Sequence, residues 1–274
     1  MTIHSLIRKC VFLSALAFAA CGGGNGSEPA GPVAAPTPAP AAPPTPESVT
    51  RDVAALLASE SRAEADRARD AGRKPAEVIA YLGIEPGMTV IDIIAAGGYY
   101  TEVLSLAVGP DGRVASQNPA RVLEMRDGAN EKALSERLAD NRLPNVYRLN
   151  KEIADLSPAD GPFDAAITAL NLHDIYNRNG EEAAIGMMRV VYSILKPGGV
   201  FGVIDHQGID GQDNAAVHRM LKADAIRFAE AAGFVVEGDS GILHVDTDDM
   251  TQSVFAEGVR GKTNRFLLKL RKPG

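Results

Sequence analysis

Apolar and polar positions along residues 48–274 follow a pattern that switches repeatedly between the strand period and the helix period. Short apolar runs rich in β-branched residues predict buried strands, and apolar residues repeated every three or four positions predict amphipathic helices. Strands are expected at residues 88–95, 113–117, 145–149, 163–170, 200–205, 234–239 and 264–270. Helices are expected at residues 48–57, 62–74, 75–82, 99–108, 119–141, 181–195 and 215–232.

The regular alternation of strands and helices predicts how the sheet is built. Strands joined by intervening helices pair in parallel through right-handed crossovers, and helices then cover both faces of the sheet. The final run places Phe266, Leu268 and Leu270 against polar neighbours, as an antiparallel strand with one covered face would. We therefore predict one α/β domain with a doubly wound, mostly parallel seven-stranded sheet and an antiparallel C-terminal strand.

The first 47 residues have the composition of a targeting segment and a spacer. Two basic residues precede the apolar run Val11–Ala20, which is too short to span a bilayer, so residues 1–20 are interpreted as a signal peptide. Cys21 follows Phe-Ala-Ala, which resembles a bacterial lipoprotein cleavage site, and residues 21–47 are rich in Pro, Ala and Gly. This predicts an exported protein held on the periplasmic side of a membrane by a lipid on Cys21, with an ordinary cleaved secretory signal as the alternative.

Charge and cysteine content exclude several classes of function. The chain has 28 Lys and Arg against 35 Asp and Glu, a net charge of −7, and no long basic run. A phosphate-tracking surface is not expected, so nucleic acid is excluded as a partner. The only two cysteines, Cys10 and Cys21, precede the domain. The domain therefore contains neither a disulfide nor a thiolate metal site.

Ligands of doubly wound sheets bind at the carboxyl ends of the strands, and the first strand-to-helix turn comes closest to them. Here Asp92 lies near the end of the first strand, and Gly97 and Gly98 precede a helix. The segment 90–102 resembles motif I of the class I S-adenosylmethionine-dependent methyltransferases, in which a Gly-x-Gly-x-Gly turn cradles the methionine part of the cofactor. Ile94 and Ala96 occupy the first two glycine positions of that motif.

Other segments extend the resemblance over roughly residues 62–273. Residues 195–205 resemble the helix stop and fifth strand of this superfamily. Residues 67–75, the Gly-Tyr-Tyr-Thr-Glu of residues 98–102 and residues 260–266 are similar to segments of a group of predicted bacterial methyltransferases, often exported. The resemblance implies a Rossmann-like fold, S-adenosylmethionine as cofactor and a small-molecule methyl acceptor.

The resemblance also implies a set of cofactor-binding residues. Asn118 falls where the family has an acid for the ribose hydroxyls, and Glu152 and Ile153 fall where adenine is contacted. Plain surface polarity is the alternative for Asn118 and Glu152, and Arg73 and Lys74 either reach the cofactor carboxylate or lie on a solvated helix face. The full expected set is Asp92, Ala95, Ala96, Gly97, Gly98, Tyr99, Asn118, Glu152, Ile153 and Asn171.

A polar cluster after the fourth strand is the candidate catalytic group. His173 could serve as a general base, with Asp174 or Asn171 orienting it, in a loop that ends near Tyr176. His206 follows the fifth strand and faces the same crevice by topology. A histidine packed at a strand end is the alternative for His173. We expect catalytic roles for His173, Asp174 and His206. The two histidines with Asp174 or Asp205 are an alternative set of metal ligands, but no metal is expected, because neither His-x-His nor His-Glu-x-x-His spacing is present.

Two other functions stay open from the sequence. The replaced glycines favour reduced cofactor affinity, so a catalytically weak or inactive periplasmic binding module of the same fold is the main alternative. An NAD-dependent oxidoreductase would share the sheet, but it needs a tighter glycine fingerprint and an acid about 20 residues further on.

Overall fold

A computed structural model of the chain describes residues 51–274. The predicted signal peptide, the lipid on Cys21 and the spacer all fall on residues 1–47, outside the described residues. No helix within residues 51–274 is both long and apolar enough to cross a membrane.

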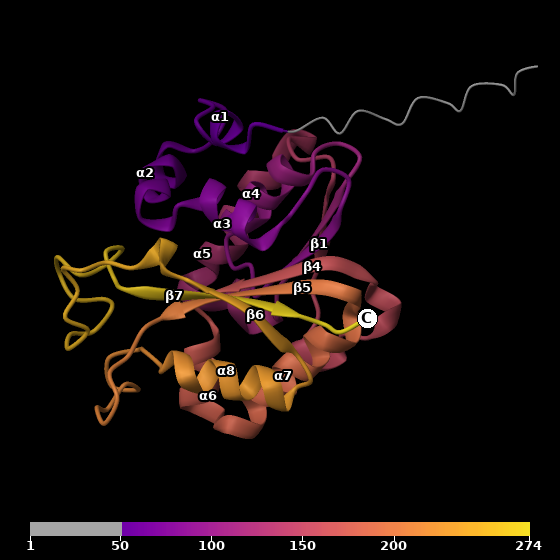
Figure 1. Cartoon of the computed structure of the whole chain (residues 1–274). Coiled ribbons are helices and arrows are strands. Elements are labelled where there is room, and N and C mark those ends of the chain that lie inside the picture. Colours follow the sequence, from indigo (N-terminus) through magenta and orange to yellow (C-terminus); the bar gives the residue numbers. More distant parts are fainter. Residues whose placement is uncertain (1–50) are drawn as a thin grey trace, which may run out of the picture. The chain divides into compact units, whose positions relative to one another are not determined.

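One seven-stranded sheet forms the centre of the described region, in the order β3-β2-β1-β4-β5-β7-β6 (Figure 1). Neighbours from β3 to β5 pair in parallel, and β7 pairs antiparallel with both β5 and β6. The predicted fold class is confirmed. The strands are β1 (Thr89–Ile93), β2 (Arg113–Gln117), β3 (Val146–Leu149), β4 (Phe163–Ala169), β5 (Leu195–His206), β6 (Val235–Ser240) and β7 (Arg265–Arg271).

Helices cover both faces of this sheet. In Figure 1, α1 to α4 lie on one side and α6 to α8 on the other. Short 3₁₀ turns, η1 to η4, lie at Ala139–Asn141, Ile153–Asp155, Pro158–Asp160 and Gly241–Leu243. The α-helices are α1 (Val53–Leu57), α2 (Glu64–Arg73), α3 (Pro75–Leu82), α4 (Tyr99–Val108), α5 (Ala120–Leu138), α6 (Leu172–Asn179), α7 (Glu181–Ile194) and α8 (Lys222–Ala231).

The two hydrophobic cores follow from the alternation of side chains along each strand. On β1, Ile91 and Ile93 enter the core that contains residues of α7 and α8, whereas Val90 enters the core that contains residues of α3 and α4. Successive side chains of a strand point to opposite faces, so a strand covered on both faces is apolar at most of its positions, and Asp92 is the buried polar exception on β1. This explains why the pattern located β1 so closely.

Four predicted elements differ from the structure. Residues 172–179, expected as loop, form α6. The helix expected at residues 119–141 is interrupted, because Met125 is extended and the next three residues, through Gly128, are left-handed. The helix expected to start at residue 215 begins only at Lys222, since the chain before it turns so that the Arg219 guanidinium enters a buried ion pair with Asp248. The fifth strand also starts earlier than expected, at Leu195, with an irregular register against β4.

Candidate active site

A cavity of about 1040 Å³ lies at the carboxyl ends of β1 and β4, where the strand order reverses. One wall comes from the chain before β1, including Asp66, Arg69 and Arg73 of α2. The opposite walls come from α5 and α6, including Val122 and Asp174. The turn after β1 lines the cavity with Ile94, Ala95, Ala96 and Gly97, followed by Tyr99.

The turn after β1 keeps a left-handed backbone without two of the expected glycines. Ile94 has φ +56°, Ala96 has φ +51° and Gly98 has φ +80°. A left-handed conformation strains residues that carry a Cβ, most of all a β-branched one. At Gly98 space is also short, because a Cβ there would lie 2.8 Å from Cδ1 of Leu134 on α5. The chain therefore holds the shape that glycines would adopt freely, at a conformational cost.

Two side-chain amides at the end of β2 hold this turn in place. The Ile94 N–H donates to Oε1 of Gln117 at 3.0 Å, and the Ala96 N–H donates to Oδ1 of Asn118 at 2.8 Å. Nδ2 of Asn118 donates back to the Ala96 carbonyl at 3.2 Å. These bonds satisfy backbone groups that the unusual conformation leaves without partners. The sequence analysis missed Gln117, although a polar residue at the end of a buried strand was the available signal.

The Asn118 side chain therefore has a structural role, because its amide bonds the backbone of the turn. Its side chain is fully buried, and it does not line the cavity. A ribose contact would require the surrounding chain to open, because the amide has no exposed surface. Glu152 and Ile153, expected at adenine, also lie away from the cavity wall, and Ile153 packs against the core. Of the residues expected to bind the cofactor, the cavity is lined by Asp92, Ala95, Ala96, Gly97, Tyr99 and Asn171, but not by Gly98 or by those expected around adenosine.

Asp92 presents a buried carboxylate to the cavity. It is 3% exposed, and Thr101 Oγ1 donates to its Oδ2 at 2.7 Å. Burial raises the pKa of Asp92 to about 7, against the opposing effects of the Thr101 hydrogen bond and of the positive charges of Arg73 and Arg137. Within residues 51–274 no basic group forms a salt bridge with it. An acid in this state favours the arrival of a positively charged group.

Arg73 presents the opposite charge to the same cavity. Its guanidinium carbon lies 4.4 Å from the centre of the Tyr99 ring, and burial lowers its pKa. Among the described residues it has no hydrogen-bond or ion-pair partner, although it lines the cavity. Lys74, in contrast, does not line the cavity, and its ammonium donates to the Ile242 carbonyl at 2.8 Å. Of the two cations considered from the sequence, Arg73 is the one in reach of a ligand.

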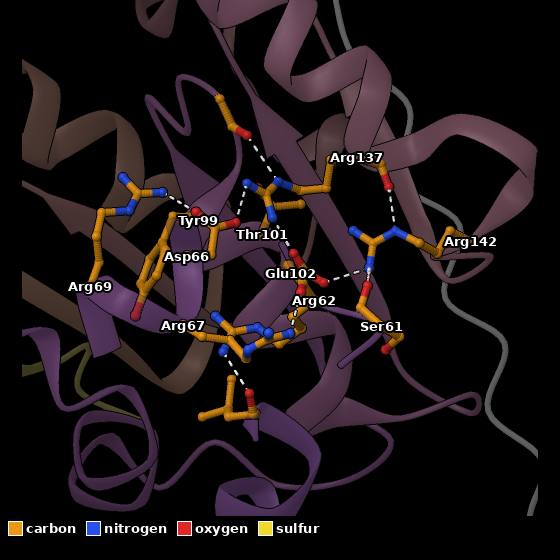
Figure 2. Close-up of polar contacts among 12 residues, drawn as sticks. Ser61, Arg62, Asp66, Arg67, Arg69, Tyr99, Thr101, Glu102, Arg137 and Arg142 are labelled. Atoms are coloured by element: carbon orange, nitrogen blue, oxygen red, sulfur yellow. Dashed lines mark hydrogen bonds and ion pairs between the residues drawn. The ribbon is translucent and has the colours of Figure 1, made fainter. Parts of the chain in front are cut away.

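A buried network of ion pairs fixes α2 over the turn (Figure 2). Arg137 of α5 contacts Asp66 of α2 at 2.6 Å and also pairs with Glu102 of α4. Its Nε donates to the Gly97 carbonyl at 2.9 Å. Arg142 adds a second contact to Glu102, at 2.6 Å. Both acids are almost fully buried, so the arginine contacts replace the water that their oxygens have lost. The network thus ties together α2, which carries Arg73, and the turn.

The predicted catalytic cluster lies at the ends of β4 and β5. His173 Nδ1 contacts Oδ1 of Asp205 at 2.6 Å, and its backbone N–H donates to Oδ2 of Asp205 at 2.9 Å. Burial opposes protonation of His173, but the Asp205 carboxylate outweighs it and raises the pKa of the imidazole above its ordinary value. Burial likewise disfavours the charged form of Asp205, and His173 still lowers the pKa of that carboxyl.

The other two predicted catalytic residues have different surroundings. The His206 ring lies 5.6 Å from the His173 ring, and its Nδ1 is buried without a partner among the described residues. Burial lowers the pKa of His206 to about 3, so this imidazole is neutral near pH 7 and a weak base. Asp174 lines the cavity, whereas His173 and His206 lie behind it.

Comparison with known proteins shows the fold. No protein-family model and no curated protein matches the chain. A SAM-dependent methyltransferase from Aquifex aeolicus is similar in structure, with a TM-score of 0.53 and 19% identity over 72% of this chain and 89% of that one. The [4+2]-cyclase SpnF is similar with a TM-score of 0.55 and 17% identity, over 81% and 90% of the two chains. The domain therefore has the class I methyltransferase fold, which does not by itself determine the reaction.

Replacement of Ala96 tests the strain in the turn. Ala96→Gly is expected to leave the free energy of unfolding unchanged or to raise it by up to about 1 kcal/mol, because glycine adopts the left-handed conformation freely. Ala68→Gly, the same change at an exposed position inside α2, should lower it by about 1 kcal/mol. Urea denaturation of both variants measures the difference. Equal losses of stability would show that the turn carries no such strain.

The buried acid predicts a pH-dependent stability. Between an ordinary pKa of 3.8 and a folded-state pKa of about 7, the unfolded chain releases a proton that folded Asp92 retains. The contribution of this group to stability therefore falls as pH rises through that window. Asp92→Asn should be more stable than the parent at pH 8, by up to about 4 kcal/mol, with a gain that vanishes near pH 4.

Denaturation curves from pH 4 to pH 8 check this expectation. Asp155→Asn, at an exposed position, is the control and should follow the parent at every pH. A stability difference between the Asp92 variant and the parent that is independent of pH would contradict the assignment of Asp92 as a buried acid.

Proposed function

We propose that this protein is an S-adenosylmethionine-dependent methyltransferase acting on a small-molecule acceptor. The observation that carries the proposal is the pair of opposite charges that Arg73 and Asp92 present to one cavity without compensating ion pairs. Asp92 is buried and Arg73 is half-buried, and holding charged groups there without ion-pair partners lowers stability, which is typical of groups retained for a ligand. An amino-acid group carries a carboxylate for the arginine and an ammonium for the acid. S-adenosylmethionine contains such a group beside a cationic sulfonium.

The residues of the cavity fit this cofactor at its methionine end. The left-handed turn brings the backbone of Ala95 to Gly97 to the cavity wall, and Ile94 is only 8% exposed because its side chain packs into the core. The bulk of Ile94 therefore lies mainly in the core. Contacts of Asn118, Glu152 and Ile153 with adenosine stay a prediction. When bound, the cofactor would supply an electrophilic methyl group.

The chain's own residues would position the acceptor at the α6 end of the cavity. Asn171 and Asp174 line this end. Behind them, Nε2 of His173 has no hydrogen-bond partner within residues 51–274, since its other nitrogen is held by Asp205. This supports removal of the acceptor's proton at His173 Nε2, while transfer itself depends on alignment of acceptor and methyl group.

Calorimetric titration tests cofactor binding directly. The parent should bind S-adenosylmethionine and S-adenosylhomocysteine with micromolar affinity. Arg73→Met should weaken both about 10- to 100-fold, the effect of losing a hydrogen bond to a charged group. Arg113→Met is the matched control, because this arginine also lies over a tyrosine, Tyr147, but at the start of β2 and away from the cavity.

Two outcomes of this titration would count against the proposal. Binding of neither compound by the folded parent would favour a binding module of the same fold with a different ligand. Equal affinity in the parent and in Arg73→Met would place the cofactor elsewhere and remove the argument from charge.

We further propose that the chain is exported and anchored by a lipid on Cys21. Three features of the sequence support this proposal. Residues 1–20 resemble a signal peptide, Cys21 follows Ala20, and a proline-rich spacer extends to residue 47. Labelling of a bacterial host with an alkyne fatty acid should mark the parent. Cys21→Ser should abolish the label, whereas Cys10→Ser, in the expected signal peptide, should keep it. Equal labelling in both variants would contradict the anchor site.

A further inference from the structure

Three potential metal ligands from two separate segments meet beside the cavity. Oδ1 of Asp174 lies 3.8 Å from Nε2 of His173 and 3.6 Å from Nδ1 of His218. One ligand atom from each residue lies within 4.8 Å of the other two. Ligand atoms 2.1 Å from a tetrahedral Zn²⁺ ion are about 3.4 Å apart. The two distances to Asp174 are longer than hydrogen bonds but close to the spacing of ligands around one ion, and the two histidine nitrogens lie within 4.8 Å of each other.

Asp205 holds His173 in the way that a carboxylate holds a histidine ligand at many metal sites. Asp205 is completely buried and holds Nδ1 of His173 at 2.6 Å, so the opposite nitrogen, Nε2, faces Asp174 and His218. A carboxylate behind a histidine ligand fixes its tautomer and the direction of its ring. Asp205 also accepts from the His173 backbone N–H, which leaves the imidazole little freedom to turn.

His218 is also held in place by its surroundings. Its backbone is left-handed, with φ +55°, and the next residue, Arg219, forms a fully buried pair with Asp248 through contacts of 2.8 and 3.0 Å. The His218 ring packs against Phe255 with ring centres 4.9 Å apart. The strained backbone and the buried neighbour direct this imidazole toward α6, as they would if its position served a function.

One side of the cluster is open. The side chains of Asp174 and His218 are 38% and 36% exposed, and Asp174 also lines the large cavity. The other charged partner of Asp174 among the described residues is Arg178, whose exposed guanidinium lies 3.3 Å away and is free to turn toward solvent. Three protein ligands with an accessible fourth position are typical of catalytic rather than structural zinc sites.

We propose that His173, Asp174 and His218 bind a divalent transition-metal ion such as Zn²⁺, with a free coordination position toward the cavity. The donor set of two imidazoles and one carboxylate suits this class of ion. Such an ion would lower the pKa of a hydroxyl or thiol bound to it, next to the place proposed for the methyl acceptor. While the ion is bound, Nε2 of His173 is a ligand and not a base. His173 can therefore bind the metal or accept a proton, but it cannot do both at once, because both use the lone pair of Nε2.

Metal titration in the absence of any cofactor tests this inference independently of the proposed function. The purified protein, stripped with a chelator, should bind one Zn²⁺ by calorimetry and should give the visible absorption of tetrahedral Co²⁺. His218→Ala and Asp174→Asn should each weaken binding by more than the roughly 10- to 100-fold that loss of an outer partner costs. His244→Ala is the matched control, because His244 pairs with Asp246 at 2.9 Å on the surface without a third ligand.

The outcomes separate the alternatives. Loss of binding in both site variants, with His244→Ala unchanged and all variants folded by circular dichroism, supports the site. No binding by the folded parent, or equal binding in His218→Ala, overturns it and leaves His173 available as a base. If His218→Ala does not fold, His218→Gln replaces it, since glutamine preserves the packing against Phe255 but is a poor ligand.

Discussion

The geometry of the cavity depends on a backbone turn that is unfavourable by itself. Ile94 and Ala96 are left-handed without being glycines, and they stay so because the amides of Gln117 and Asn118 bind their N–H groups. Gly98 is the N-cap of the following helix, α4, so the position of that helix is also fixed by this turn. A chain with glycines could relax there, whereas this chain exchanges flexibility for a single rigid shape. Preorganisation of this kind lowers the entropy lost when a ligand binds.

Buried ion pairs between the surrounding helices also hold the turn and α2 in this arrangement. Asp66, Glu102 and Arg137 come from three different helices and are all nearly removed from solvent. Such a network adds little net stability, because desolvation offsets the attraction between the charges. Its effect is selective, since any other packing of α2 would leave a charge buried without a partner. The position of Arg73, which α2 carries, is thereby determined by an ion-pair network of which Asp66 and Arg137 also line the cavity.

Hydrophobic periodicity predicted the strands of the sheet, but it could not predict which polar side chains contact each other. Strands buried on both faces, such as β1 and β2, have an unmistakable local pattern, and their bounds were predicted to within a few residues. The helix expected from residue 215 failed because a local pattern does not reveal that Arg219 is buried by an acid 29 residues later. The same limit applies to the site. Asp92, Asp174 and the turn followed from topology, but the contact between His218 and Asp174 exists only after the chain has folded.

The position of β7 determines when this fold can be completed. β7, Arg265–Arg271, lies between β5 and β6 and is the only strand partner of β6 among the described residues. Until β7 has been synthesised, β6 has no strand partner among the described residues, and one edge of β5 stays open. Because β7 follows both of its partners in the chain, the two pairings that complete the sheet form only after all the other described strands have been made.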